Sequence, residues 1–256
     1  MRYNSIFDLK NKVAVVVGGA GLIGSEIVKG LSDFGAKVYI ADIDKQAAGK
    51  IKTRGIKFIY LDIASEDSIY RALNAVCEEA KGIDILINCA YPRTDDWGLG
   101  LEKVTFDSWK ENVNNHLGGY FICSKVAAEL MKKKSGGVII NFASIYGVVA
   151  PDFSIYRGTK ITMPAAYSAI KGGIINFTKY LATYYAKYNI RANVISPGGV
   201  FNRQDPLFVK RYADKTPLKR MAKPLDMVGA VIYLSSEAAA YITGQNLLVD
   251  GGWSVW

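Results

Sequence analysis

Short runs of apolar, largely β-branched residues alternate along the chain with longer stretches in which apolar positions recur at helical spacing. The short runs are apolar on both faces, which is typical of strands in a parallel sheet that is covered on both sides. The expected strands span residues 13–17, 37–41, 57–61, 84–87, 138–142, 191–195 and 246–249. The expected helices span residues 23–34, 66–80, 105–133 and 165–187.

This alternation predicts an α/β protein with a single domain over residues 1–256. Because crossovers between parallel strands are right-handed, the chain would form a doubly wound (Rossmann) sheet of about seven parallel strands with helices on both faces. Two long stretches interrupt the rhythm, at about 145–166 and about 199–224. Both follow the carboxyl ends of expected strands, where ligands bind in this architecture. We therefore expect an insertion beside the substrate pocket and a substrate flap over it.

Composition narrows the possible functions. The sequence holds three cysteines without a CxxC pair and one histidine, so neither a disulfide framework nor a multi-histidine metal site is indicated. It has no signal-peptide core, and no run approaches the roughly 18 apolar residues that a membrane span needs. We therefore expect a cytoplasmic protein with no metal and no membrane contact.

The net charge of +9 is concentrated in the expected flap. Between residues 201 and 224, seven lysines and arginines face two aspartates, a net of +5. Such a segment is either a solvated loop or a flap that attracts an acidic or phosphorylated substrate. The three lysines at 132–134 end an expected helix, where cations interact favourably with the helix dipole. Charge alone therefore does not indicate nucleic-acid binding, and we expect none.

A glycine-rich turn follows the first expected strand, with the sequence GGAGLIG over residues 18–24. Glycines allow the tight turn and the close approach of backbone to a pyrophosphate, and the following helix offers its positive end to that anion. Asp42 stands at the end of the next strand. A carboxylate there can bind the adenosine ribose and repels a 2′-phosphate, so NAD is favoured over NADP.

Several further motifs, in order along the chain, resemble those of the short-chain dehydrogenase/reductase family over essentially its full length. They are Asp62 after the third strand, Asn88-Cys89-Ala90-Tyr91, Asn141-Phe142-Ala143-Ser144, the YxxxK of Tyr167 and Lys171, and Pro197-Gly198. The resemblance implies an oxidoreductase acting on CH–OH groups. The cofactor contacts that it implies are Gly18, Gly21, Leu22, Ile23, Gly24, Asp42, Asp62, Ile63, Asn88, Ala90, Tyr167, Lys171, Pro197, Gly198 and Val200.

The YxxxK spacing occurs twice, at Tyr156–Lys160 and at Tyr167–Lys171. Residues four apart share a face only on a helix, and a glycine and a proline make a helix through the first copy unfavourable. The second copy opens an uninterrupted helical pattern, so we expect Tyr167 and Lys171 to be catalytic. A tyrosine with a pKa near 10 is a poor base, and a nearby ammonium group would lower that pKa.

Two other polar residues have expected roles in the same reaction. Ser144 would hydrogen-bond the substrate oxygen and stabilise the charge that develops there. His116 stands where family members usually have an asparagine that binds a relay water, and a histidine could serve in that relay. Alternatively, Asn114 or Asn115 takes this role and His116 only packs. Both interpretations are open at this point.

Together these features predict an NAD-dependent enzyme that transfers a hydride between the nicotinamide and a secondary alcohol or ketone. The inserted loop looks similar to oxidoreductases of flagellin modification, and with the charged flap it suggests a polar, acidic or phosphorylated sugar-like substrate. The family resemblance implies a homodimer or homotetramer. The alternatives are a reductase of 3-oxoacyl thioesters, which usually uses NADP, and an NAD-binding structural or regulatory protein without catalysis.

Overall fold

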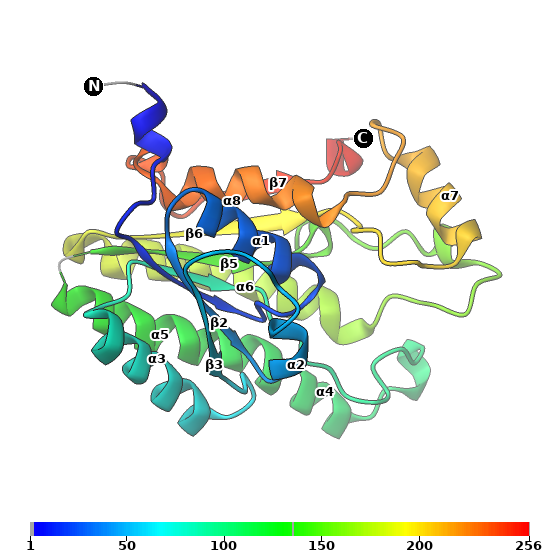
Figure 1. The fold of residues 1–256 in the computed structure, drawn as a ribbon. Coiled ribbons are helices and arrows are strands. Elements are labelled where there is room, and N and C mark those ends of the chain that lie inside the picture. The colour runs from blue at the N-terminus through cyan, green and yellow to red at the C-terminus, as the bar shows by residue number, and fades with distance from the viewer. Residues whose placement is uncertain (1–2, 135, 256) are drawn as a thin grey trace.

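The computed structural model describes residues 3–134 and 136–255, which wind around a central parallel sheet (Figure 1). The strands are β1 (Val13–Val17), β2 (Lys37–Asp42), β3 (Ile56–Tyr60), β4 (Ile85–Asn88), β5 (Gly137–Phe142), β6 (Ile190–Pro197) and β7 (Asn246–Val249). They form one seven-stranded sheet in the order β3-β2-β1-β4-β5-β6-β7, with every pairing parallel. The doubly wound fold and all of the expected strands are thus confirmed.

The winding of the sheet reverses beside β1. Val17, the last residue of β1, pairs with Ala41 of β2 on one side and with Asn88 of β4 on the other. The chain therefore builds outward in both directions from this point, and the loops that follow β1 and β4 diverge. A crevice at the carboxyl ends of the strands is the usual ligand site of such a sheet.

Helices cover both faces of the sheet, because each strand is apolar on both sides. The helices are α1 (Leu22–Asp33), α2 (Lys45–Ala48), α3 (Glu66–Ala80), α4 (Phe106–Val113), α5 (Gly119–Lys133), α6 (Ala165–Tyr185), α7 (Pro206–Lys215) and α8 (Val228–Ser235). One buried core lies between the sheet and α3, α5 and α6, and a second lies under α1 and α8. Figure 1 shows these two layers on opposite sides of the strands.

Two segments differ from the expected helices and loops. The expected helix over 105–133 contains a π-helical stretch, Asn114–Gly118, between α4 and α5. Such a wider turn shifts the helix face, and it often lies at a functional site. The expected flap contains helix α7. Its start is marked by Asp205, whose carboxylate accepts a hydrogen bond from the Leu207 N–H, and by a proline at the first helical position.

A third apolar cluster joins three parts of the chain at one end of the sheet. It comprises Ile145, Tyr146, Ile155, Tyr156, Phe208, Tyr212, Met221 and Trp253. We call these residues the substrate-side cluster. Tyr212 of α7 stacks on Trp253 near the C-terminus, with ring centroids 4.2 Å apart. The insertion and the flap are therefore packed against each other and against the end of the chain.

The described residues were also considered for a membrane-spanning helix and for a metal site. No helix among them is both long enough and apolar enough to cross a membrane. No group of three or more histidine, cysteine or acidic side chains within residues 3–134 and 136–255 is arranged to hold a metal ion. The three cysteines are free thiols.

Candidate active site

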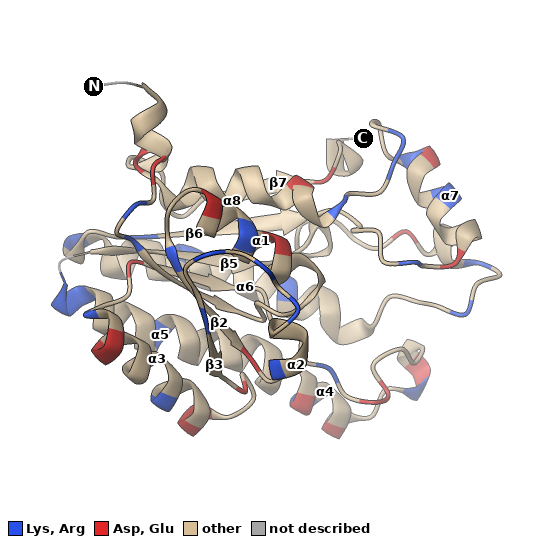
Figure 2. Ribbon diagram, in the orientation of Figure 1, with Lys and Arg blue, Asp and Glu red and all other residues tan. Residues whose placement is uncertain are grey.

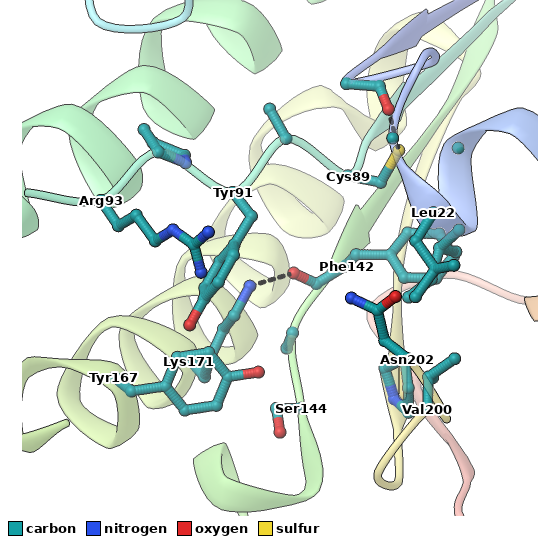
Figure 3. Close-up of a pocket in the computed structure, with 18 of the residues that line it drawn as sticks. Leu22, Cys89, Tyr91, Arg93, Phe142, Ser144, Tyr167, Lys171, Val200 and Asn202 are labelled. Carbon is teal, nitrogen blue, oxygen red and sulfur yellow. Dashed lines mark hydrogen bonds between the residues drawn. The ribbon is translucent and has the colours of Figure 1, made fainter. Parts of the chain in front are cut away.

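A cavity of about 760 Å³ opens at the carboxyl ends of the strands. All of the expected cofactor contacts except Asn88 line it, as does Ser144. We call the part beside residues 18–24 and Asp42 the glycine-turn end, and the part beside Ser144 and Tyr167 the tyrosine end. Figure 3 shows residues of both ends facing the same space.

Two glycines of the turn, Gly18 and Gly24, have no room for a side chain. Gly18 has a left-handed backbone (φ +78°), and a Cβ atom there would lie 2.5 Å from the Ala90 backbone. A Cβ atom on Gly24 would lie 2.1 Å from the Gly18 carbonyl oxygen. The backbone between β1 and α1 is therefore open to the cavity, and α1 points its amino end toward it. This arrangement fits a pyrophosphate, because backbone N–H groups at a helix start bind anions.

Asp42 ties the glycine turn to the end of β2. One carboxylate oxygen accepts a hydrogen bond from the Ala20 N–H at 2.9 Å, and the other accepts one from the Asp44 N–H at 3.0 Å. Among the described residues that line the cavity, the only cations are Arg93 and Lys171. Both belong to the tyrosine end, so the glycine-turn end offers a carboxylate and no cation to a bound ribose.

Ser144, Tyr167 and Lys171 converge at the tyrosine end, although they come from different elements (Figure 3). Ser144 follows β5, and Tyr167 and Lys171 lie one turn apart at the start of α6. The Lys171 ammonium group donates a hydrogen bond to the Phe142 carbonyl at 3.0 Å and lies 5.6 Å from the centre of the Tyr167 ring. A tyrosine hydroxyl, a serine hydroxyl and a lysine are thus available to one ligand.

Burial sets the protonation of this group. Burial raises the pKa of Tyr167 above its ordinary value, although a hydrogen bond with Ser144 opposes the shift. Burial also lowers the pKa of Lys171 to about 7. The expectation that Lys171 lowers the pKa of Tyr167 is therefore not met by the protein alone, because the lysine is itself only partly charged at neutral pH.

His116 lies behind the cavity and not on its surface. It is fully buried in the π-helical stretch, and its Nε2 atom lies 3.1 Å from the Lys171 Nζ atom. Burial lowers the pKa of His116 well below its ordinary value, so the ring is neutral and can accept a hydrogen bond from Lys171. Asn114 is exposed and Asn115 is half-buried. Of the three residues considered for the relay, His116 is the one that contacts Lys171. It does not line the cavity, so it contacts the lysine and would not touch a ligand there.

Asn88 does not line the cavity, contrary to expectation. Its side chain is fully buried and donates hydrogen bonds to Asn141 at 2.9 Å and to Ser124 at 3.1 Å. Asn88 ends β4, and its side chain points into the layer between the sheet and α5. Its hydrogen bonds connect β4 to β5 and to α5 beneath the cavity.

The first YxxxK copy, Tyr156–Lys160, is not helical beyond its tyrosine. Tyr156 ends a short 3₁₀ turn, and Lys160 lies in an exposed bend. The Tyr156 hydroxyl lies 3.3 Å from the Tyr146 hydroxyl within the substrate-side cluster. The uninterrupted helix expected from residue 165 onward is confirmed as α6, which places Tyr167 and Lys171 on one face.

Several residues of the tyrosine end were not expected from the sequence. Tyr91 packs edge-on against Tyr167, with ring centroids 5.8 Å apart, and against His116 at 5.5 Å. Its hydroxyl accepts a hydrogen bond from the Trp97 indole N–H at 2.7 Å, and Arg93 lies over its other side. Tyr91 ends the motif Asn88-Cys89-Ala90-Tyr91, and a large aromatic residue after the end of β4 is the signal that a side chain enters the site there.

The positive charges of the flap do not face the cavity. From this segment Val200, Asn202, Gln204, Phe208, Tyr212 and Met221 line it, and none of the seven lysines and arginines does. Two of those cations pair with carboxylates outside the flap instead: Lys215 pairs with Asp152 of the insertion, and Arg220 with Asp226. Figure 2 shows the basic residues of α7 at one end of the molecule. The expected contact between flap cations and a substrate is therefore not supported by their placement.

Comparisons with known proteins agree with this fold. A family model described as enoyl-(acyl carrier protein) reductase matches residues 18–254. The chain belongs to the short-chain dehydrogenase/reductase family. It is 32% identical over 255 residues to the post-translational flagellin modification protein A of Campylobacter coli, covering 96% of this chain and 100% of the relative.

Solved structures show the same architecture. A short-chain dehydrogenase from Leptospira borgpetersenii with bound NAD+ is 39% identical, with a TM-score of 0.90 over 99% of this chain and 97% of that one. A gluconate 5-dehydrogenase from Burkholderia cenocepacia in complex with NADP and tartrate is 26% identical, with a TM-score of 0.88 over 98% of each chain. Both dinucleotides thus occur among the structures that this chain resembles.

Proposed function

We propose that the protein is an NAD-dependent oxidoreductase that interconverts a secondary alcohol and a ketone. The observation that carries this proposal is the convergence of Ser144, Tyr167 and Lys171 at one end of a cavity whose other end is an open glycine turn. The bound dinucleotide would accept or donate the hydride. The glycine turn would hold its pyrophosphate, and Asp42 its adenosine ribose.

The protein's own residues would manage the proton and the orientation of the substrate. In ketone reduction, the neutral Tyr167 hydroxyl donates its proton to the ketone oxygen as the hydride is added to the carbonyl carbon. In alcohol oxidation, the Tyr167 phenolate accepts the substrate hydroxyl proton as the hydride leaves the carbon that carries the hydroxyl group. Ser144 hydrogen-bonds the reacting oxygen, and its hydrogen bond with Tyr167 aligns the two hydroxyl groups. The Lys171 amine lies 5.6 Å from the centre of the Tyr167 ring, and in its protonated form it would stabilise the phenolate. In this proposal His116 positions Lys171 and takes no direct part in proton transfer.

NAD is the preferred dinucleotide in this proposal. A 2′-phosphate would lie near the Asp42 carboxylate, and no lysine or arginine lines the described part of the cavity at that end. Repulsion without a compensating cation disfavours NADP. The same argument disfavours a 3-oxoacyl-thioester reductase, which usually uses NADP.

The proposed substrate is a small, polar, acidic alcohol of carbohydrate type. Tyr91, Tyr146 and Tyr156 provide aromatic faces at the tyrosine end, and a few polar groups there can fix the orientation of a ligand. Two of the proteins that this chain resembles, a flagellin modification protein and a gluconate 5-dehydrogenase, have names consistent with such a substrate.

We propose a homodimer or homotetramer assembled through the outer faces of α5 and α6. Phe121, Tyr180 and Tyr184 are large side chains exposed on these helices, at 44%, 59% and 52%. Exposed apolar groups that gather on one face mark interaction surfaces. Light scattering of the purified protein tests this proposal.

The proposed reaction is tested by NAD reduction with a panel of sugars, sugar acids and sugar phosphates. In the variant Tyr167→Phe we expect turnover to fall by about 10²–10⁴-fold, because the proton-transfer group is lost. NAD affinity should remain within about threefold of the original, a change of about 0.65 kcal/mol, because the substitution removes one hydroxyl group and keeps the ring.

Two matched variants complete this experiment. Tyr156→Phe removes the hydroxyl of the other YxxxK copy and should cost far less turnover than Tyr167→Phe. Tyr185→Phe removes a hydroxyl at the end of α6, outside the cavity, that donates a hydrogen bond to Glu129 of α5, and it should leave turnover unchanged. The proposal is wrong if Tyr167→Phe retains turnover, or if NADP with an acyl thioester is the better substrate pair.

A further inference from the structure

Arg93 is a cation at the tyrosine end of the cavity that has no acidic partner. It follows β4, lines the cavity and is exposed. Within residues 3–134 and 136–255, no carboxylate lies within ion-pair distance of its guanidinium group. The nearby Asp96 accepts hydrogen bonds from Thr94 and Ser108 instead. The charge of Arg93 is therefore available to a ligand.

The other charged groups of the cavity are engaged or distant. Lys171 is buried against Phe142 and His116. The acidic residues that line the cavity, Asp42, Asp44 and Asp62, follow β2 and β3, on the opposite side of β1 from β4. The tyrosine end thus has an exposed cation and no lining carboxylate, which is an environment that favours an anion.

The neighbours of Arg93 fix its position relative to the reacting group. Its guanidinium carbon lies 5.8 Å from the centre of the Tyr91 ring, and Tyr91 in turn packs edge-on against Tyr167. Trp97 donates its indole N–H to the Tyr91 hydroxyl, so that this hydroxyl keeps its own proton for donation to a ligand. Figure 3 shows Arg93 extending from the segment after β4 toward the Tyr91 ring.

We propose that Arg93, supported by Tyr91, binds an anionic group of the substrate and so determines its specificity. The inference rests on the proposed oxidoreductase function and adds the residue that selects acidic alcohols. A guanidinium group suits this role, because its planar donors match carboxylate and phosphate oxygens in pairs. It also replaces the flap cations as the source of acid recognition, since none of them lines the cavity.

Binding of three matched probes tests the proposal. Sorbitol, gluconate and sorbitol 6-phosphate share a six-carbon polyol chain and carry no charge, a carboxylate and a phosphate. Calorimetric titration in the presence of NADH measures the binding of each probe, because NADH cannot accept a hydride and the alcohol is not oxidised. A parallel titration without dinucleotide shows how much of each probe's affinity depends on the bound dinucleotide. We expect at least one acid to bind about 10–100-fold more tightly than sorbitol, the range for a charge-assisted hydrogen-bonded pair. The acid that binds more tightly shows whether the site prefers a carboxylate or a phosphate.

The variants locate that preference. Arg93→Gln should abolish the tighter binding of the acid relative to sorbitol, while the affinities for sorbitol and for NADH should change by less than about threefold. Arg93→Lys should restore part of it, because lysine keeps the charge but not the paired donors. Arg203→Gln removes a flap arginine that does not line the cavity, and it should keep the full preference.

The outcomes separate this inference from the proposed function. If the acids bind no better than sorbitol through the millimolar range, or if their advantage survives Arg93→Gln, Arg93 does not select an anion. Such a result would leave NAD-dependent turnover and its loss in Tyr167→Phe untouched. Conversely, a protein that binds acids through Arg93 but never reduces NAD would retain this site and lose the proposed reaction.

Discussion

The two ends of the cavity are built in different ways. At the glycine-turn end, the backbone of the turn, several apolar side chains and three carboxylates form the surface, which comes from the segments 17–24, 42–47 and 61–63. At the tyrosine end, side chains form the surface, and they come from segments after β4, β5 and β6. The first end leaves little freedom to substitute Gly18 or Gly24, because a Cβ atom at either position would overlap neighbouring backbone. The second can change its ligand by changing single side chains.

This comparison predicts that one methyl group is enough to disable the glycine-turn end. In Gly24→Ala, the new Cβ atom would lie 2.1 Å from the Gly18 carbonyl oxygen, so the turn must open. We expect NAD affinity to fall by about 100-fold, in line with the cost of overpacking. Gly229→Ala is the matched control, since nothing lies within 4 Å of its Cβ position, and it should bind NAD normally. Calorimetry measures both, and equal affinities would refute the assigned role of the turn.

At the tyrosine end the sensitive property is a buried charge. Lys171 has a pKa of about 7 in the folded protein and about 10.5 in the unfolded chain, so the unfolded chain binds more protons between these values. Stability from this residue is therefore lost as pH falls through that window. Between pH 7 and pH 9, the free energy of unfolding of the original protein should therefore rise by about 2 kcal/mol relative to that of Lys171→Met.

Urea denaturation of the ligand-free protein at both pH values measures this difference. Lys160→Met, which removes an exposed lysine of the first YxxxK copy, serves as the control and should show no such pH dependence. A constant difference between the original protein and Lys171→Met would mean that burial does not perturb the lysine.

The smallest effect is expected at Asp42, where a side chain enters the glycine-turn end. Asp42→Ser removes the carboxylate that would face a 2′-phosphate, and it weakens the link to the Ala20 N–H. We expect NAD affinity to fall and NADP affinity to rise, each by about tenfold or less, consistent with one lost charge contact. Titration with both dinucleotides measures the ratio. If the original protein already binds NADP as tightly as NAD, Asp42 does not discriminate.

Most of the fold could be predicted from the sequence, because it follows from local patterns. Strands that are apolar on both faces identified the whole parallel sheet, and the uninterrupted pattern from residue 165 identified α6. Helix α7 was missed, since its few buried positions lie within a strongly charged segment, although Asp205 and Pro206 mark its start. The π-helical stretch has no local signal. It depends on how α4 and α5 pack.

The candidate site divides in the same way. Residues close together in sequence, such as the glycine turn and the pair Tyr167–Lys171, were identified by their spacing. Contacts between distant segments were not. His116 meets Lys171 across 55 residues, and Asn88 turns away from the cavity because Asn141 and Ser124 offer it buried partners. Whether the lysines and arginines of the flap face the cavity likewise depends on the orientation of α7, which the spacing of residues along the sequence does not reveal.

The substrate-side cluster also bears on how such a protein could diversify. Its members come from the insertion, the flap and the C-terminal end, and they pack with one another apart from the two cores under the sheet. Exchange of these three segments together would keep their mutual packing and leave the strands undisturbed. The cluster is thus a replaceable module, through which a lineage could acquire a new substrate while inheriting its dinucleotide site unchanged.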